Sequence, residues 1–364
     1  MKFIQLMPTS SPFSGVLDTS FFTRKSAKVF NEWFHQGLIK LSERDITIDY
    51  LKNIPQLFGE PNLIEDYYKK YAELDGRDEL QGAIHESAIN FLQEPPTIFD
   101  LHSQYRLDAM PDLFKAQKNL DFLSDLQEAW INYGFLIIPN ALNEILTQAY
   151  LDIREQCGDT KTFCSGASFT EYQQIRELFC NPALTQMLCL LTGGSIALYI
   201  VFAHSLVSTE RPWHQDQYLV ADNIYGSSVS AWVALGDVAE EQGPFQFIPG
   251  SHRFGILDYE RVSHYLNPEC LIGGERGHLW TSYAHLLTTQ AYSKLFLLDG
   301  VKSYSFTPRK GDIMISHPRL IHRAGLPTSS SIRPGIIGQW TTFDSPLATG
   351  NLKQDSSDRG WYWS

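Results

Sequence analysis

The sequence has few cysteines and no long apolar run, and each shortage excludes a class of protein. Its 364 residues include five Cys, an odd number, and no Cys-x-x-Cys spacing occurs. This pattern is typical of reduced thiols in the cytoplasm and argues against a disulfide framework. No stretch approaches the roughly 18 apolar residues of a membrane span. The apolar run at the N-terminus is too short for a secretory signal.

Basic residues are also in short supply: 29 Lys and Arg stand against 41 Asp and Glu, which gives a net charge of −12. This balance argues against nucleic acid or an anionic membrane as the partner, because both bind clustered Lys and Arg. Hydrophobic residues make up 43% of the chain, enough for a sizeable core in one large domain with an extension, or in two domains. We therefore expect a soluble cytoplasmic protein.

Residues 1–118 are predicted to form a helical extension. Apolar residues recur at helical spacing between Phe22 and Ile39, and further helices are predicted near residues 63–74 and 78–92. No cluster of polar residues typical of chemistry lies in this part. Two interpretations stay open. The extension is either a helical cover on a catalytic domain or a module that docks a protein partner or a second copy of the chain.

The pattern changes near residue 119. A helix over 122–133 is expected to end at Gly134 and to be followed by a short strand and a helix capped by Asn140 or Asn143. From Ile196 onward, short β-branched and aromatic runs alternate with turn residues, which favours a sandwich or jelly roll over a doubly wound sheet. The expected fold is mainly β with a helical cover. It comprises the extension, a jelly-roll (double-stranded β-helix) domain over 119–349 and a tail over 350–364.

Candidate chemistry begins at Trp213-His214-Gln215-Asp216-Gln217. Residues two apart on a strand project to the same face, so His214 and Asp216 would lie side by side. With a second His they would form the 2-His-1-carboxylate triad of non-haem Fe(II) oxygenases, which leaves open positions on the metal. A His-x-Asp spacing alone is more often a turn or a solvated strand edge than a metal site.

Three later histidines compete for the remaining ligand position. His252 follows Pro249-Gly250-Ser251 at a sharp reversal, where a structural role is favoured. His317 ends a predicted strand just before a proline, and His322 follows that break. Arg333 comes eleven residues after His322, which lets the chain return on a neighbouring strand. A guanidinium there would grip a carboxylate through two hydrogen bonds near the metal.

Together these motifs resemble the phytanoyl-CoA dioxygenase family of Fe(II)- and 2-oxoglutarate-dependent oxygenases, over roughly residues 120–345. The resemblance rests on His214-x-Asp216, Gly243-Pro244, Pro249-Gly250-Ser251-His252, Gly311-Asp312, His322 and Arg333, and on the lead-in Trp130 to Pro139. It implies that three residues ligate Fe(II): His214, Asp216 and His322. It also implies that Arg333 binds the far carboxylate of 2-oxoglutarate and that Trp232 lines the co-substrate pocket, although Trp232 reads equally well as a core aromatic.

The same resemblance implies Fe(II), 2-oxoglutarate and O2 as cofactor and co-substrates, and succinate and CO2 as products. The implied reaction hydroxylates an unactivated C–H of a small organic substrate: lipid-like, amino-acid-derived or a secondary metabolite. Asp216 favours hydroxylation over halogenation, because related halogenases have a small residue there that admits chloride. Other outcomes are desaturation, isomerisation or halogenation, or a non-catalytic metal- or ligand-binding jelly roll. Ala324 stands where some members have a Ser that contacts the co-substrate. Residues 253–307 are the expected selectivity segment.

Overall fold

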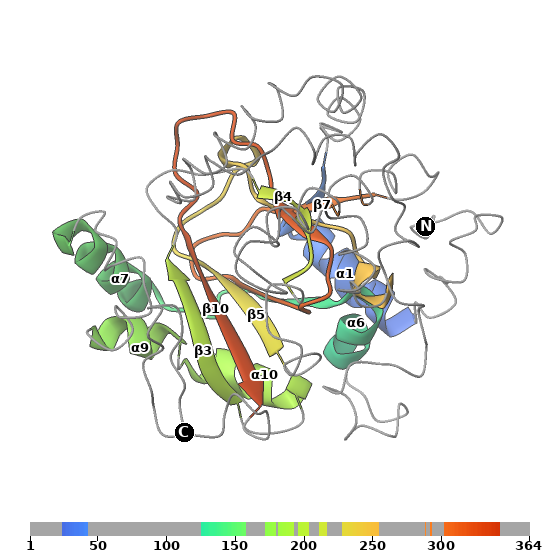
Figure 1. The fold of residues 1–364 in the computed structure, drawn as a ribbon, viewed down its shortest axis with the longest axis horizontal. Helices are drawn as coiled ribbons and strands as arrows, with labels where there is room; N and C mark the ends of the chain where they lie inside the picture. The colour runs from blue at the N-terminus through green and yellow to red at the C-terminus, as the bar shows by residue number, and fades with distance from the viewer. Residues whose placement is uncertain are drawn as a thin grey trace, which may run out of the picture.

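Two five-stranded antiparallel sheets, with helices at their margins, form the body of the protein (Figure 1). The structure, a computed structural model, describes residues 24–42, 125–157, 172–179, 181–192, 196–203, 211–216, 228–254, 288, 292 and 302–342. The helices predicted at 63–74 and 78–92 and the tail at 350–364 lie outside these ranges. Within the described ranges, no helix has the length and apolar character needed to cross a membrane.

The strand order is β1-β7-β6-β9-β4 in one sheet and β2-β8-β5-β10-β3 in the other. The pairs are nested: β3 with β10, β4 with β9, β5 with β8, and β6 with β7. Strands β3 to β6 thus pair antiparallel, in reverse order, with β7 to β10, and the resulting long hairpin is folded over two layers. A jelly roll has this strand order. The predicted sheet-rich core of antiparallel strands is confirmed. The bounds are β1 Ile39–Leu41, β2 Phe135–Ile138, β3 Ile196–Ala203, β4 Arg211–His214, β5 Ser228–Ala234, β6 Phe245–Phe247, β7 Tyr304–Phe306, β8 Ile313–Ser316, β9 His322–Ala324 and β10 Gly335–Thr342.

Helices flank the sheets on two sides. Figure 1 shows α7, α9 and α10 beside the sheet that contains β3 and β10, and α1 next to α6 on the other side. Short 3-10 turns, η7 and η8, precede and follow β6. The bounds are α1 Arg24–His35, α6 Asp125–Tyr133, α7 Glu144–Cys157, α9 Gln173–Phe179, α10 Pro182–Thr192, η7 Glu240–Gln242 and η8 Ser251–Phe254.

The junction between α6 and β2 follows the local sequence signals. Gly134 ends the helix with φ of +75°, a left-handed conformation that favours glycine. A Cβ at this position would also lie 2.5 Å from Nδ1 of His252, so the close packing of the two segments needs glycine. Of the two predicted caps for α7, Asn143 is the one used: its Oδ1 accepts the Leu146 backbone N–H at 2.8 Å.

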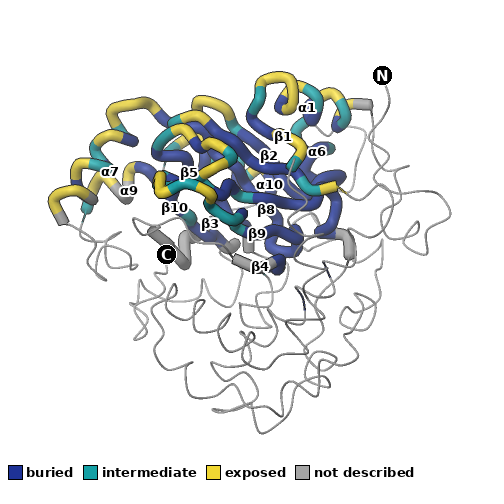
Figure 2. Tube along the Cα trace, turned by 90° about the horizontal axis from the view of Figure 1, so that it is seen from above, coloured by how far each residue is buried: buried dark blue, intermediate teal, exposed yellow. Residues whose placement is uncertain are grey.

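Aromatic side chains join the two sheets. Phe135 on β2 contacts Phe247 on β6, with ring centroids 4.5 Å apart, and Trp232 on β5 meets Phe306 on β7 edge-on at 5.7 Å. All four are buried. Strands β5 and β8 are buried along their described lengths, while exposed residues lie on the outside, on α1, on α7 and on connecting loops (Figure 2). The core therefore lies between the sheets.

Residues 24–42 belong to this body. Phe30 on α1 contacts the ring of Phe135 on β2 at 6.2 Å and that of Tyr304 on β7 at 5.2 Å, so it touches both sheets. The prediction that the helix extends to Ile39 is wrong. The helix stops at His35, and the positive φ of Gly37 turns the chain into strand β1 on the edge of β7. For these residues the structure favours the cover interpretation.

One part of the predicted selectivity segment is core sheet. Tyr304–Phe306, near the end of residues 253–307, forms β7 between β1 and β6, and all three residues are buried. The sequence run is too short to show strand periodicity, so it gave no local signal.

Truncating Phe30 tests whether α1 shares the core. Phe30→Ala should lower the free energy of unfolding by about 3–5 kcal/mol, because the side chain is 3% exposed. Phe34, on the same helix, is 44% exposed, and Phe34→Ala should change stability by no more than about 0.5 kcal/mol. Urea unfolding of both variants measures the difference. Equal losses would show that α1 packs independently of the sheets.

Candidate metal centre

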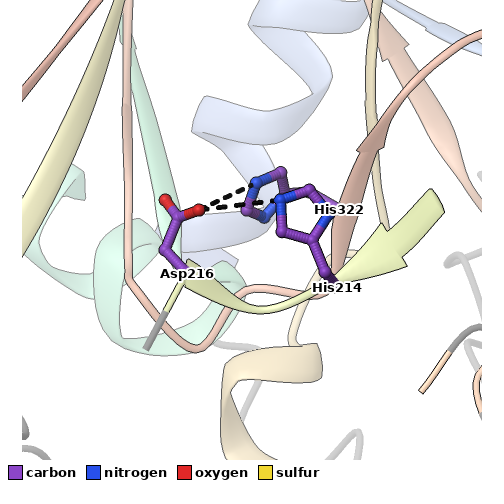
Figure 3. A group of neighbouring side chains, drawn as sticks. All are labelled: His214, Asp216 and His322. Carbon is purple, nitrogen blue, oxygen red and sulfur yellow. Dashed lines mark ion pairs between the residues drawn. The ribbon is translucent and has the colours of Figure 1, made fainter. Parts of the chain in front are cut away.

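Three side chains with metal-binding atoms meet at the end of β4 and the start of β9. His214 is the last residue of β4 and lies directly opposite His322, the first residue of β9. Their rings are 4.2 Å apart, centroid to centroid. Oδ1 of Asp216 lies 3.7 Å from Nε2 of His214 and 3.5 Å from Nε2 of His322 (Figure 3). One ligand atom from each residue fits within 4.8 Å of the others, close enough for one metal ion.

The predicted location of Asp216 needs a correction. The His-x-Asp spacing predicts that His214 and Asp216 lie on one strand. In the structure β4 ends at His214, and Asp216 follows in a short turn. The turn, and not strand alternation, brings the carboxylate beside the imidazole. Gln215 explains part of this turn: buried between the two, it donates to the Arg319 carbonyl at 2.6 Å and ties the turn to the segment before β9.

His322 is oriented by two neighbours. Its Nδ1 lies 2.8 Å from the Leu320 carbonyl oxygen, and because a carbonyl only accepts, Nδ1 carries the proton. This arrangement leaves Nε2, the nitrogen that faces Asp216, as the one available to bind a metal. The ring of Phe245 stacks on His322 with centroids 4.8 Å apart, which fixes the plane of the imidazole.

Asp216 is an ionised carboxylate whose side chain is 15% exposed. Burial alone would raise the pKa of Asp216, but the imidazole of His322, then that of His214 and the Ser230 hydroxyl, hold this pKa well below its ordinary value. Its Oδ2 accepts hydrogen bonds from Ser230 at 2.9 Å and from Gln339 at 3.4 Å. Oδ1 thus faces one nitrogen atom of each imidazole. A cation between them would satisfy all three atoms, so the donor set fits a divalent metal.

The competing histidines lie elsewhere. His317 is buried beside His252, with ring centroids 5.2 Å apart, and its Nδ1 accepts the Arg319 backbone N–H at 3.0 Å. His252 is also buried, and its Nε2 lies 3.0 Å from the Ile131 carbonyl oxygen. Among the described residues, the metal-capable group contains His322 and neither of these two.

The other predicted site residues, Arg333 and Trp232, lie on or beside β10 and β5. Arg333 is buried two residues before β10, and its guanidinium donates to the Gly243 carbonyl. Gly243 lies two residues before Phe245, whose ring stacks on His322. Trp232 is buried, and a Cβ at Gly335 would fall 2.0 Å from its ring, so its packing depends on that glycine. Their roles at a co-substrate remain predictions.

Sequence reasoning missed three residues at the site: Ser230, Gln339 and Phe245. None belongs to a recognisable metal motif, and each reaches the cluster through strand register. The available signal was alternation, because Ser230 and Trp232 stand two apart on β5 and so share a face.

Two sequence comparisons find the same family that the motifs resemble. A model of the phytanoyl-CoA dioxygenase (PhyH) family matches residues 161–270, which include His214 and Asp216. The L-proline trans-4-hydroxylase of Streptomyces griseoviridis is 28% identical over 163 residues, 42% of this chain and 57% of the relative. The chain therefore spans little more than half the length of this curated relative. The match confirms the predicted resemblance to the phytanoyl-CoA dioxygenase family.

Solved structures show a more distant similarity. EctD from S. alaskensis with bound Fe has a TM-score of 0.47 at 14% identity, covering 69% of this chain and 88% of that one. The epimerase SnoN in complex with Fe3+, alpha ketoglutarate and nogalamycin RO has a TM-score of 0.42 at 20% identity, covering 60% and 82%. At this level, neither structure defines correspondences between individual residues.

The stability of the protein should fall in mild acid because of His317. Burial, with His252 and Arg319 nearby, holds the pKa of His317 well below its usual value. The unfolded chain takes up this proton near pH 6.5 while the folded one does not, so stability is lost as pH falls below that value, by at most about 1.4 kcal/mol per pH unit. His317→Asn keeps an acceptor for the Arg319 N–H and removes the titration.

Urea unfolding of the metal-free wild type and of His317→Asn, from about pH 7.5 to about pH 5, measures this effect. The wild type should be the more stable protein at the higher pH. The difference in unfolding free energy between the wild type and His317→Asn should shrink as the pH falls. A constant gap would mean that His317 does not titrate differently in the folded and unfolded states.

Proposed function

We propose that this protein is an Fe(II)- and 2-oxoglutarate-dependent dioxygenase that hydroxylates an unactivated C–H of a small organic substrate. The observation that carries the proposal is the convergence of two imidazoles and one carboxylate, from the ends of β4 and β9, on a single point. The match of residues 161–270 to the phytanoyl-CoA dioxygenase family model supports it. His214, Asp216 and His322 would hold the iron.

The metal and co-substrate, when bound, supply the oxidation: 2-oxoglutarate and O2 give succinate, CO2 and one oxygen atom inserted into the C–H bond. The chain's own residues bind and orient. His322 presents Nε2 because its Nδ1 is engaged by a backbone carbonyl. Phe245 covers one face of that ring and excludes water from it. Arg333, buried near Gly243, would hold the far carboxylate of 2-oxoglutarate through its planar fork of donors.

Two observations favour hydroxylation among the outcomes of this chemistry. Asp216 supplies a carboxylate at the place where a halogenase needs room for chloride. The similarity to an L-proline trans-4-hydroxylase favours the same outcome and, of the three substrate classes, the amino-acid-derived one. Incubating the protein with Fe(II), 2-oxoglutarate, ascorbate and a panel of amino-acid derivatives, L-proline included, tests both points. Product mass then separates a gain of one oxygen atom from loss of two hydrogens, from rearrangement and from chlorination.

A non-catalytic ligand-binding protein is the alternative from another class, and succinate release decides between the two. Wild-type protein with Fe(II) and 2-oxoglutarate should release succinate, slowly without substrate and faster with it. A protein that binds Fe(II) and 2-oxoglutarate yet releases no succinate with any substrate of the panel would contradict the proposal.

Replacing His322 should remove bound iron, whereas replacing His317 should leave it in place. His322→Ala should lose both bound iron and succinate release, because it removes a ligand from the cluster. His317→Asn should keep both, because His317 packs against His252 outside the cluster. Iron content after dialysis and succinate yield are the two readouts. The reverse outcome would show that His317 is the ligand.

Arg333→Ala should weaken 2-oxoglutarate binding. A hydrogen-bonded pair between charged groups contributes roughly 1.5–3 kcal/mol, which corresponds to about ten- to a hundredfold in affinity. Arg333→Lys should fall between the two, since it keeps the charge and loses the fork. Anaerobic titration of the Fe(II) protein, followed by the metal-to-ligand absorption band, measures the midpoint. An unchanged midpoint in Arg333→Ala would place the carboxylate on another residue.

A further inference from the structure

The two oxygens of the Asp216 carboxylate have separate partners. Oδ1 faces the imidazoles, 3.7 Å from Nε2 of His214 and 3.5 Å from Nε2 of His322. Oδ2 points the other way and accepts from Ser230 at 2.9 Å and from Gln339 at 3.4 Å. The first of these has an ordinary hydrogen-bond length and the second is long. The carboxylate is therefore fixed in rotation as well as in place.

The two donors reach Oδ2 because of sheet register. Ser230 on β5 and Gln339 on β10 are directly paired, so their side chains project from the same face of one sheet. Asp216 approaches that face from the end of β4, in the opposite sheet. Both donors are buried, at 5% and 7% exposure. Two paired strands thus hold one oxygen of a carboxylate that the other sheet supplies.

We infer that Ser230 and Gln339 are positioning residues that keep Oδ2 away from the metal, so that Asp216 attaches through Oδ1 alone. This inference rests on the proposed metal site. A carboxylate free to rotate can bind a metal through both oxygens, and the second oxygen would then take up one of the open positions that the co-substrates need. Holding Oδ2 by hydrogen bonds keeps that position open and limits the rotation that would otherwise weaken the Oδ1 contact.

The chain offers a matched control. Ser316 on β8 pairs with Ser230 on its other side, projects from the same face and is equally buried at 5%. Among the described residues, Ser316 makes no hydrogen bond to Asp216. Ser316→Ala therefore removes the same hydroxyl from the same row of the sheet without touching the carboxylate, and Ser230→Thr restores a hydroxyl at the position under test.

Co(II) serves as an air-stable probe of the site in the otherwise metal-free protein. Its binding is titrated by visible absorption, which reports affinity and, through band intensity, the number of coordinating atoms. Outer hydrogen-bond partners of metal ligands change affinity by about ten- to a hundredfold. Ser230→Ala should weaken Co(II) about tenfold, Gln339→Met less because its hydrogen bond is longer, and the double variant most. Ser316→Ala and Ser230→Thr should match the wild type in both affinity and spectrum.

Two results would overturn the inference: equal Co(II) affinity and spectrum in Ser230→Ala and Ser316→Ala, or a Ser230→Thr variant as weak as Ser230→Ala. Thermal unfolding midpoints of the metal-free variants show whether a loss of Co(II) affinity reflects a general loss of stability. A Co(II) affinity that falls in parallel with the midpoint also counts against the inference. Failure of the proposed function looks different, because then the wild type would bind no Co(II), or His322→Ala would bind it as well as the wild type does.

Discussion

A largely enclosed carboxylate beside two imidazoles is the arrangement on which the rest of the site depends. Burying a charge costs several kcal/mol unless hydrogen bonds and counter-charges surround it, and here four strands supply those partners. β4 and β9 bring the imidazoles from one sheet, while β5 and β10 bring Ser230 and Gln339 from the other. A slip of one residue in either pairing would turn a partner to the opposite face. The site is thus a property of both sheets in register.

The position of His322 depends in turn on residues that bind nothing. The chain between β8 and β9 is held by the Ser251 hydroxyl, which accepts the Ile321 N–H at 2.8 Å, and by His317, which accepts the Arg319 N–H at 3.0 Å. Leu320 then offers its carbonyl to Nδ1 of His322. The Pro-Gly-Ser-His turn therefore shapes the metal centre without providing a ligand, which explains why a histidine so prominent in the sequence lies outside the cluster.

Local signals in the sequence predicted local structure, and motif spacing predicted the centre. Gly134, the strand after it and the Asn143 cap are short-range features, and each was found where expected. The three-residue strands β7 and β9 are too short to show a period, and the turn that carries Asp216 looks like strand in an His-x-Asp spacing. Alternation places Ser230 on the same face as Trp232, but the shared role of Ser230 and Gln339 exists only once β5 and β10 pair.

The pairing of β1 with β7 has a consequence for how the protein is made. Ile39 lies opposite Phe306, so an early strand must wait for a partner that emerges from the ribosome 306 − 39 = 267 residues later. At about 5–20 residues per second, the wait lasts on the order of 15 to 50 s. Throughout it, Phe30 and Trp33 have no completed sheet to pack on, so the nascent chain exposes apolar side chains that chaperones have time to recognise.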